Sequence, residues 1–187
     1  MRSVYIAIIV IIAIVVSVKS SYAKGIVLPG KVFISPDKNY SFKIEDYDRV
    51  YHFVVKDLSS GKVTSFEVEH NPIFSVKWTF DSKSIFIVAH YARGKLLDMI
   101  HNDGGKWTLG EITPPENREY ECEILDWNFK KDYVRLTFKV MIYSRASPEY
   151  YKCSFDYNPS TGLRSNYSKS LLSFDTYRDT KSSLAPD

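Results

Sequence analysis

The sequence is poor in the residues that support metal sites and disulfide frameworks. Its 187 residues include 2 cysteines and 4 histidines, and no histidine stands at metal-ligand spacing from another histidine or a cysteine. Neither charge is in large excess, because 25 Lys and Arg residues face 22 Asp and Glu residues. This balance argues against the basic surface typical of a nucleic-acid-binding protein. We therefore expect no metal, no cofactor and no nucleic-acid partner.

Helical periodicity and common catalytic motifs are missing as well. No segment of ten or more residues after residue 23 shows a clear helical pattern. There is no Gly-x-Ser-x-Gly elbow and no phosphate-binding glycine loop. A hydrophobic content of 44%, with 15% aromatic residues, is ample for a core and excludes a disordered chain. We expect an all-β protein without catalytic residues.

The first 23 residues are typical of a secretory signal peptide. Arg2 supplies a positive charge, an uncharged apolar run extends over residues 4–16, and Ser21-Tyr22-Ala23 places small residues at the −3 and −1 positions. The run is shorter than the roughly 18 to 20 residues of a spanning helix. We expect cleavage after Ala23, no stable membrane insertion afterwards, and a single all-β domain over residues 24–187 in the periplasm or outside the cell. An uncleaved anchor is the alternative.

A unit of four short strands is clearest between Phe74 and Gly110. Strand-like runs alternate with polar or glycine-containing turns at residues 81–83, 92–94 and 102–105. Pro114-Pro115 then ends the unit, because proline cannot donate a hydrogen bond to a sheet.

The same pattern recurs before this unit. Asp37 and Asp81 stand 44 residues apart, and Gly61 and Gly105 repeat that offset. A period of about 40 to 45 residues with four strands is typical of β-propeller blades.

A third unit follows, with an insertion. Trp127 follows Trp78 by 49 residues, whereas Gly162 follows Gly105 by 57. The difference predicts an insertion between Lys139 and Tyr151, and the two tryptophans are expected in equivalent positions between sheets. The predicted units cover residues 31–69, 74–115 and 120–167, and a flexible tail is predicted from about residue 178 to 187.

The first unit carries two further turn signatures, Ile34-Ser-Pro-Asp37 and Asp57-Leu-Ser-Ser-Gly61. They resemble the "Ser-Pro-Asp-Gly" and "Asp-Leu-x-x-Gly" turns of TolB-type and prolyl-oligopeptidase-type β-propeller blades. Lys38 replaces the usual glycine, and Lys130-Lys131 stand where the third unit would have its aspartate. In those propellers the motif is structural, so the resemblance implies a fold and no chemistry.

Three units pose a closure problem, because closed propellers have about four to eight blades. We expect three four-stranded antiparallel units in a compact propeller-like domain whose termini help to close it. A dimer with six units is a further possibility, and a two-sheet β-sandwich is the alternative fold.

The two cysteines give conflicting expectations. An even count in an exported chain favours a disulfide between Cys122 and Cys153. The predicted strand order instead places them on the first and third strands of one unit, roughly 9 to 10 Å apart, beyond the bridging limit of about 7 Å. The export argument favours the disulfide, and two free thiols are the alternative.

The predicted insertion supplies the leading candidate for a functional surface. It contains Tyr143, Arg145, Tyr150 and Tyr151, which belong to the residue types enriched at interface hot spots. We therefore predict an exported, non-enzymatic module that docks a protein partner. Its general organisation is similar to that of immunity proteins that block periplasmic cell-wall-degrading toxins, so an inhibitor role is one form of this hypothesis.

Two other functions stay open. Trp107 follows a turn and is a candidate platform for a carbohydrate or small ligand, with packing at a sheet edge as the alternative. Glu119, Glu121 and Glu123 alternate along one strand and share a face. Because paired carboxylates serve glycoside hydrolysis, a hydrolase of unrecognised type is the third hypothesis, and a solvated strand face is the other explanation.

Overall fold

The computed structural model describes residues 27, 29–48, 50–69, 71–91, 94–116, 120–144 and 147–181. The predicted signal peptide, Arg145 and the last part of the predicted tail lie outside these residues. Twelve strands and one short helix are described. They are β1 (Val32–Ile34), β2 (Tyr40–Tyr47), β3 (Val50–Asp57), β4 (Val63–Glu69), β5 (Ile73–Trp78), β6 (Ser84–Tyr91), β7 (Gly94–Asp103), β8 (Lys106–Glu111), β9 (Tyr120–Phe129), β10 (Val134–Ile142), β11 (Glu149–Tyr157), β12 (Arg164–Leu172) and α2 (Phe174–Asp179).

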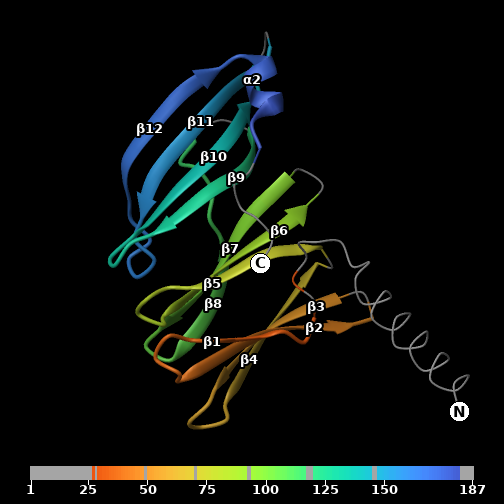
Figure 1. Ribbon diagram of the computed structural model, residues 1–187, viewed down its shortest axis with the longest axis vertical. Coiled ribbons are helices and arrows are strands. Elements are labelled where there is room, and N and C mark those ends of the chain that lie inside the picture. Colours follow the sequence, from red (N-terminus) through yellow and green to blue (C-terminus); the bar gives the residue numbers. More distant parts are fainter. Residues whose placement is uncertain are drawn as a thin grey trace, which may run out of the picture.

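The strands form three separate four-stranded antiparallel sheets, each a simple meander. Sheet A contains β1 to β4, sheet B contains β5 to β8, and sheet C contains β9 to β12. Each sheet corresponds to one predicted unit, and the three are stacked side by side like successive propeller blades (Figure 1). The propeller-like prediction is confirmed, and the stack is not closed into a ring.

Sheet B lies in the middle and is buried on both faces. Ile85 and Ile87 of β6 belong to a core shared with sheet A, whereas Phe86 and Val88 belong to a core shared with sheet C. Because side chains alternate along a strand, an almost continuous apolar run is the pattern that a strand covered on both faces requires. The run from Ser84 onward, predicted as a strand, meets that requirement.

The two end sheets are apolar on one face only. In sheet C, β10 alternates buried residues such as Leu136 and Phe138 with Arg135, Thr137 and Lys139. A fourth sheet would have to pack against those three polar side chains. The outer face of sheet C is therefore polar along β10, unlike the inner face that packs on sheet B.

Sheet A has the same asymmetry on its opposite face. Phe42 and Ile44 of β2 are fully buried against sheet B, whereas the alternating residues Ser41, Lys43 and Glu45 lie on the outer face. The outer face of each end sheet is thus mixed or polar, and the three-sheet stack does not depend on a further blade for its core.

Helix α2 covers part of the outer face of sheet C. Ser173 caps its N-terminus by accepting a hydrogen bond from the Thr176 N–H. The ring of Tyr177 lies 4.7 Å from that of Tyr150, and Lys139 Nζ donates to the Thr180 carbonyl (3.4 Å). This helix corrects the expectation of β elements only, and it orders the start of the segment predicted as a flexible tail.

No helix among the described residues combines the length and apolar character that a membrane crossing requires.

Trp78 and Trp127 each point toward the preceding sheet, but they do not occupy equivalent places in their strands. Trp127 stands two residues before the place that is equivalent to that of Trp78. Trp78 is the last residue of β5 and packs toward sheet A, where its indole N–H donates to the Phe33 carbonyl (3.2 Å). Trp127 packs toward sheet B, but Phe129 is the last residue of β9. Phe129 therefore occupies the place equivalent to Trp78, which corrects the predicted alignment.

Candidate functional site

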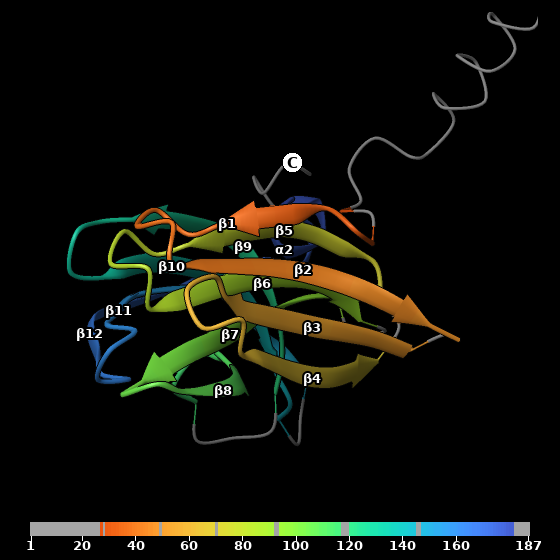
Figure 2. The same ribbon diagram turned by 90° about the horizontal axis from the view of Figure 1, so that it is seen from below.

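The turns that join the first and second strand of each sheet gather at one end of the stack, on the left in both views (Figures 1 and 2). The loops between β3 and β4, β7 and β8, and β11 and β12 lie at the same ends of their sheets, because every sheet is a meander. We call this end of the molecule the turn face.

The first two turns are held by the same side-chain network. In sheet A the Ser35 hydroxyl donates to Asp37 Oδ1 (2.6 Å), and the Tyr40 N–H donates to Ser35 Oγ (3.0 Å). In sheet B the Thr79 hydroxyl donates to Asp81 Oδ1 (2.6 Å), and the Ser84 N–H donates to Thr79 Oγ1 (2.9 Å). The repeated aspartate is therefore a structural residue, as the sequence pattern predicted.

These two turns also contact each other. The Asp37 N–H donates to Ser82 Oγ (3.0 Å), and Ser82 is almost fully buried. Ser82 has a φ of 61°, and Lys38 at the equivalent position has a φ of 62°. The turns of sheets A and B thus form one continuous, rigid part of the turn face.

The third turn departs from this pattern. It is shorter, because the Lys130 N–H donates to the Tyr133 carbonyl (2.9 Å), whereas the equivalent bonds of the first two turns run from Ser35 to Tyr40 and from Thr79 to Ser84. A hollow of about 360 Å³ lies between it, the turn of sheet B and the loop between β11 and β12. We call it the Phe80–Tyr133 hollow; it is lined by Thr79, Phe80, Asp81, Lys130, Lys131, Asp132, Tyr133, Val134, Asn158, Pro159 and Ser160.

Two aromatic side chains at this hollow are open to solvent. Phe80 is 63% exposed and Tyr133 is 37% exposed. Tyr133 also lines a neighbouring hollow of about 410 Å³, together with Leu163, which is 68% exposed. Exposed apolar side chains that cluster around a depression are typical of a binding surface.

The neighbouring hollow contains a fixed polar group. The Arg135 guanidinium donates to Asp156 Oδ1 (3.1 Å), and the Asn166 amide donates to Asp156 Oδ2 (2.6 Å). Asn166 has a φ of 51°, and its carbonyl accepts from the same guanidinium (3.0 Å). This network anchors the start of β12 and so fixes the wall of the neighbouring hollow.

A serine–histidine pair lies near a third hollow of about 350 Å³ on the turn face. Ser84 Oγ and His101 Nδ1 are 2.8 Å apart, and His101 lines the hollow. Ser84 is fully buried, so its hydroxyl has no access to a substrate. We interpret this contact as a cross-strand hydrogen bond between β6 and β7.

Trp107 lies between sheets A and B. Its ring centroid is 5.2 Å from that of Tyr40 and 6.1 Å from that of Trp78, with both contacts edge-on. The depression beside it measures about 40 Å³, which leaves little room for a ligand. Trp107 therefore packs against the core between the sheets, and the structure gives no support to its predicted role as a ligand platform.

The residues predicted to bind a partner do not share one surface. The insertion mostly lengthens the hairpin of β10 and β11, so Tyr150 and Tyr151 point to opposite faces of sheet C. Tyr150 packs against Phe174 and Tyr177 on the outer face, whereas the Tyr151 ring lies 4.0 Å from Lys169 Nζ on the inner face. Tyr143 is exposed and donates to Glu121 (2.5 Å).

Tyr150→Ala should release α2 from sheet C, because it removes two aromatic contacts that hold the helix. Such pairs contribute about 0.5 to 1.5 kcal/mol each, so we expect a loss of about 1 to 3 kcal/mol in the free energy of unfolding. Amide hydrogen exchange at residues 176–180 should become faster. Tyr47→Ala, at an exposed tyrosine of sheet A, should leave these amides unchanged. Unaltered exchange in Tyr150→Ala would show that α2 docks by other contacts.

Cys122 and Cys153 are both free and buried. They lie on β9 and β11 with β10 between them, since Cys122 pairs with Val140 and Cys153 pairs with Phe138. The expected disulfide is therefore wrong, and the objection from strand spacing was correct. Burial raises the pKa of the Cys122 thiol to about 12, and burial also raises the pKa of the Cys153 thiol.

Neither thiol should react with Ellman's reagent at pH 8 in the folded protein, because the thiolate is the reactive form and both side chains are buried. Both should react after unfolding without a reductant. Rapid reaction of the native protein would contradict the burial of these thiols. Failure to react after unfolding would point to a disulfide instead.

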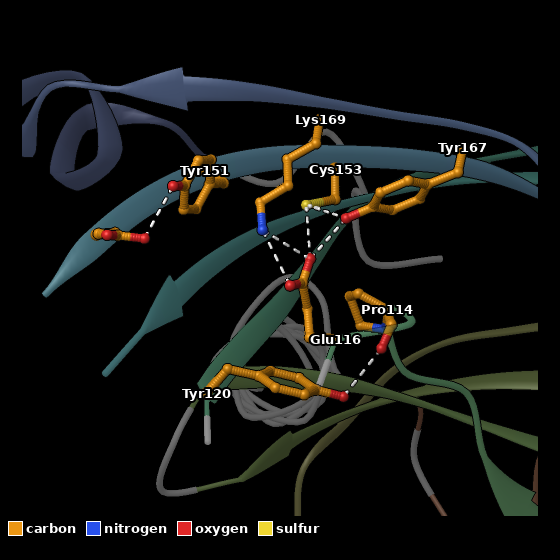
Figure 3. A network of polar contacts seen from close by, with 8 residues as sticks. Pro114, Glu116, Tyr120, Tyr151, Cys153, Tyr167 and Lys169 are labelled. Atoms are coloured by element: carbon orange, nitrogen blue, oxygen red, sulfur yellow. Dashed lines mark hydrogen bonds and ion pairs between the residues drawn. The ribbon is translucent and has the colours of Figure 1, made fainter. Parts of the chain in front are cut away.

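A polar cluster around Cys153 ties the linker before β9 to sheet C (Figure 3). Glu116 accepts from the Tyr167 hydroxyl (2.6 Å) and pairs with Lys169 Nζ (2.9 Å). The Tyr167 hydroxyl also lies 3.4 Å from Cys153 Sγ. The raised pKa of this buried thiol makes it a poor nucleophile, so we interpret the cluster as a structural clamp.

Glu116→Ala should lower the free energy of unfolding by about 1.5 to 3 kcal/mol, because it removes the charged partner of Tyr167 and Lys169. The Glu116 side chain is only 9% exposed, so solvent cannot fully replace it. Denaturant titration gives the value, and Glu67→Ala on the exposed side of β4 is the control. A change no larger than that of the control would mean that the clamp is weak.

Two of the glutamates on which the hydrolase hypothesis rests already form contacts with neighbouring side chains. Glu123 pairs with Lys139 (2.8 Å), and Glu121 accepts from Tyr143. Glu119 lies outside the described residues. Within the part of the chain that the structure describes, no group of three or more His, Cys, Asp or Glu residues is placed to hold a metal ion.

Sequence reasoning missed the Phe80–Tyr133 hollow, although one signal was present. The sequence pattern assigned Lys130-Lys131 to the place of the turn aspartate. With Phe129 aligned to Trp78, Asp132 stands at the place of Asp81, and Lys130 replaces the Ser35 or Thr79 hydroxyl that binds the aspartate in the first two turns. This loss of the hydroxyl coincides with the hollow.

Comparison with solved structures shows likeness in fold. TolB from Acinetobacter baumannii has 14% identity over 81% of this chain and 33% of its own, with a TM-score of 0.40. The β-propeller domain of the Trilobed protease from Pyrococcus furiosus has 13% identity over 83% of this chain and 58% of its own (TM-score 0.41). The periplasmic gluconolactonase PpgL from Pseudomonas aeruginosa has 8% identity over 78% and 57% (TM-score 0.33).

The predicted resemblance to TolB-type blades is confirmed at the level of fold. The chain spans between about a third and three fifths of the length of these solved structures. No protein-family model matches the sequence, and no curated protein matches it either.

Proposed function

We propose that this protein is an exported, non-enzymatic module that docks a protein partner through its turn face. The observation behind this proposal is the pair of solvent-open aromatic side chains, Phe80 and Tyr133, at the Phe80–Tyr133 hollow. Export rests on the signal-peptide pattern of residues 1–23. An inhibitor or immunity-type role, in which the partner is an enzyme of the same compartment, is the specific form that we favour.

The chemistry of the hollow suits a protein surface. Aromatic side chains dominate interface hot spots because they bury a large area at a small cost in conformational entropy. Mixed charges at the rim, from Asp81, Lys130 and Lys131, suit the polar border of such an interface.

The rigidity of the turns favours tight docking. Asp81 is bound to Thr79 within its turn, and that turn is bound to the turn of sheet A. A surface that is already ordered loses little entropy when a partner binds. The turn of sheet B therefore presents Phe80 from a fixed frame.

Site-specific photo-crosslinking in the native host tests this proposal. A photoreactive amino acid at position 80 should give a discrete adduct with one protein, and Tyr133→Ala should reduce that adduct. The same amino acid at position 47, on an exposed residue at the opposite end of sheet A, is the control. The purified partner must then bind the purified protein directly. Adducts of equal yield at both positions, or an adduct with no direct binding, would overturn the proposal.

A further inference from the structure

Strand β12 is the outermost strand of sheet C (Figure 1). Among the residues that the structure describes, it pairs with β11 alone, and every residue of β12 except Leu172 is exposed. The pairing shifts register once, between Ser154 and Asp156 of β11, and residues 168–172 then pair without interruption. We call residues 168–172 the β12 edge, because their other side has no strand beside it in the described chain.

The β12 edge lacks the usual protection against strand pairing. Proteins protect free edges by keeping the strand short or by placing charged side chains on it. Strand β1 has three residues, and β4 ends with two glutamates in its last three positions. The one charged residue of the β12 edge is Lys169, and its ammonium group is held on sheet C by Glu116 (2.9 Å). Leu171 beside it is 71% exposed.

The backbone groups of Lys169 and Leu171 point away from β11. At the start of this hairpin the Asn158 N–H donates to the Leu163 carbonyl (2.9 Å). Alternate residues of an antiparallel strand bond to the same neighbour, so the even-numbered residues of β11 bond to the even-numbered residues of the β12 edge. The N–H and C=O groups of the two odd-numbered residues are therefore available to another strand.

We propose that two copies of this chain pair through the β12 edge, antiparallel and about a two-fold axis at Ser170, to form one continuous sheet. Only an axis at Ser170 pairs every residue of the β12 edge with a residue of the same edge. Lys169 of each copy then lies opposite Leu171 of the other, and such a pair exchanges two hydrogen bonds. This register also avoids placing Lys169 opposite itself, where like charges would be destabilising.

The side chains of the β12 edge suit this register. The exposed Leu171 side chain would pack on the aliphatic stem of Lys169 from the second copy, and the small Ser170 side chains would meet at the axis. The shared residues lie in the half of β12 away from the turn face, so the dimer leaves both turn faces open. The inference does not depend on the docking function proposed above.

Sedimentation velocity of the purified exported protein should show a monomer–dimer equilibrium that depends on concentration. Leu171→Pro should raise the dissociation constant of the dimer at least about tenfold, because it removes an N–H that points to the second copy. Proline is tolerated where the N–H of an edge strand faces solvent, so circular dichroism should show a folded monomer. Ser65→Pro, on the exposed side of edge strand β4, is the control and should leave the dimer unchanged.

Two cysteine variants test the register even if the proline variant does not fold. In Ser170→Cys the two thiols meet at the axis, with Cα atoms roughly 4.5 Å apart, so mild oxidation should give a covalent dimer. In Ser168→Cys they are separated by roughly 13 Å along the strands and should not crosslink. The native cysteines are buried. Monomers at every concentration, equal crosslinking of the two cysteine variants, or a dimer unaffected by a folded Leu171→Pro variant would overturn the proposal.

Discussion

Phe86→Ala should lower the free energy of unfolding by about 3 to 5 kcal/mol. Phe86 is fully buried in the core between sheets B and C, where its ring lies 5.2 Å from that of Phe129 and 6.4 Å from that of Tyr157. The substitution removes these edge contacts and leaves a cavity that the rigid strands around it cannot close. Denaturant titration, with an unchanged m-value, measures the loss.

Phe80→Ala is the matched control, because it makes the same chemical change at a residue that is 63% exposed. An exposed site away from buried networks should change stability by no more than about 0.5 kcal/mol. A loss below 1 kcal/mol in Phe86→Ala, or similar losses in the two variants, would contradict the described packing between sheets B and C.

Phe80→Ala/Tyr133→Ala should weaken binding of the crosslinked partner by at least about 2 kcal/mol, or about thirtyfold in Kd, if the hollow holds hot spots. Both side chains are open to solvent in the free protein, so their apolar area is available to be buried by a partner. Isothermal titration with the purified partner gives the change in affinity, and thermal unfolding should move little.

Tyr47→Ala/Leu171→Ala supplies the matched control for this binding experiment. Tyr47 and Leu171 are 56% and 71% exposed, and they lie at the ends of β2 and β12 that are far from the turn face. This double variant should bind the partner with unchanged affinity. Equal weakening by the two double variants, or unfolding of the Phe80/Tyr133 variant, would remove the turn face from consideration as the docking surface.

The repeat architecture was predictable because its turns are held by local contacts. Asp37 and Asp81 each bind residues within their own turn, so the motif and the structure that it stabilises lie in the same few residues. The position of Trp127 was mispredicted because the third turn has a different length, which shifts the alignment by two residues. An alignment by residue type alone cannot detect such a shift.

Helix α2 was missed because six residues are too few to show helical periodicity. Its cap was nevertheless visible, since Ser173 precedes Phe174-Asp175 and a serine followed by an acidic first turn is a helix-start signal. What the sequence could not show is the surface that stabilises the helix. Tyr150 lies far away along the chain and meets α2 only in the folded sheet.

The disulfide prediction was wrong, and the Phe80–Tyr133 hollow was not predicted, for different reasons. For Cys122 and Cys153 the sheet geometry was predicted correctly, and a general argument from compartment was wrongly preferred to it. The Phe80–Tyr133 hollow combines turns of two sheets with the loop after β11. Its residues come together only through the stacking of sheets, which no local pattern encodes.

The open stack has a consequence for cooperativity. The buried residues of the A–B core and of the B–C core are separate sets, and only sheet B contributes to both. The described cores therefore couple sheets A and C through sheet B, as neighbouring units are coupled in a linear repeat array. We expect sheet A to open sub-globally while the B–C pair persists. A partner bound between the tips of sheets B and C would slow exchange in those two sheets and leave the opening of sheet A unprotected.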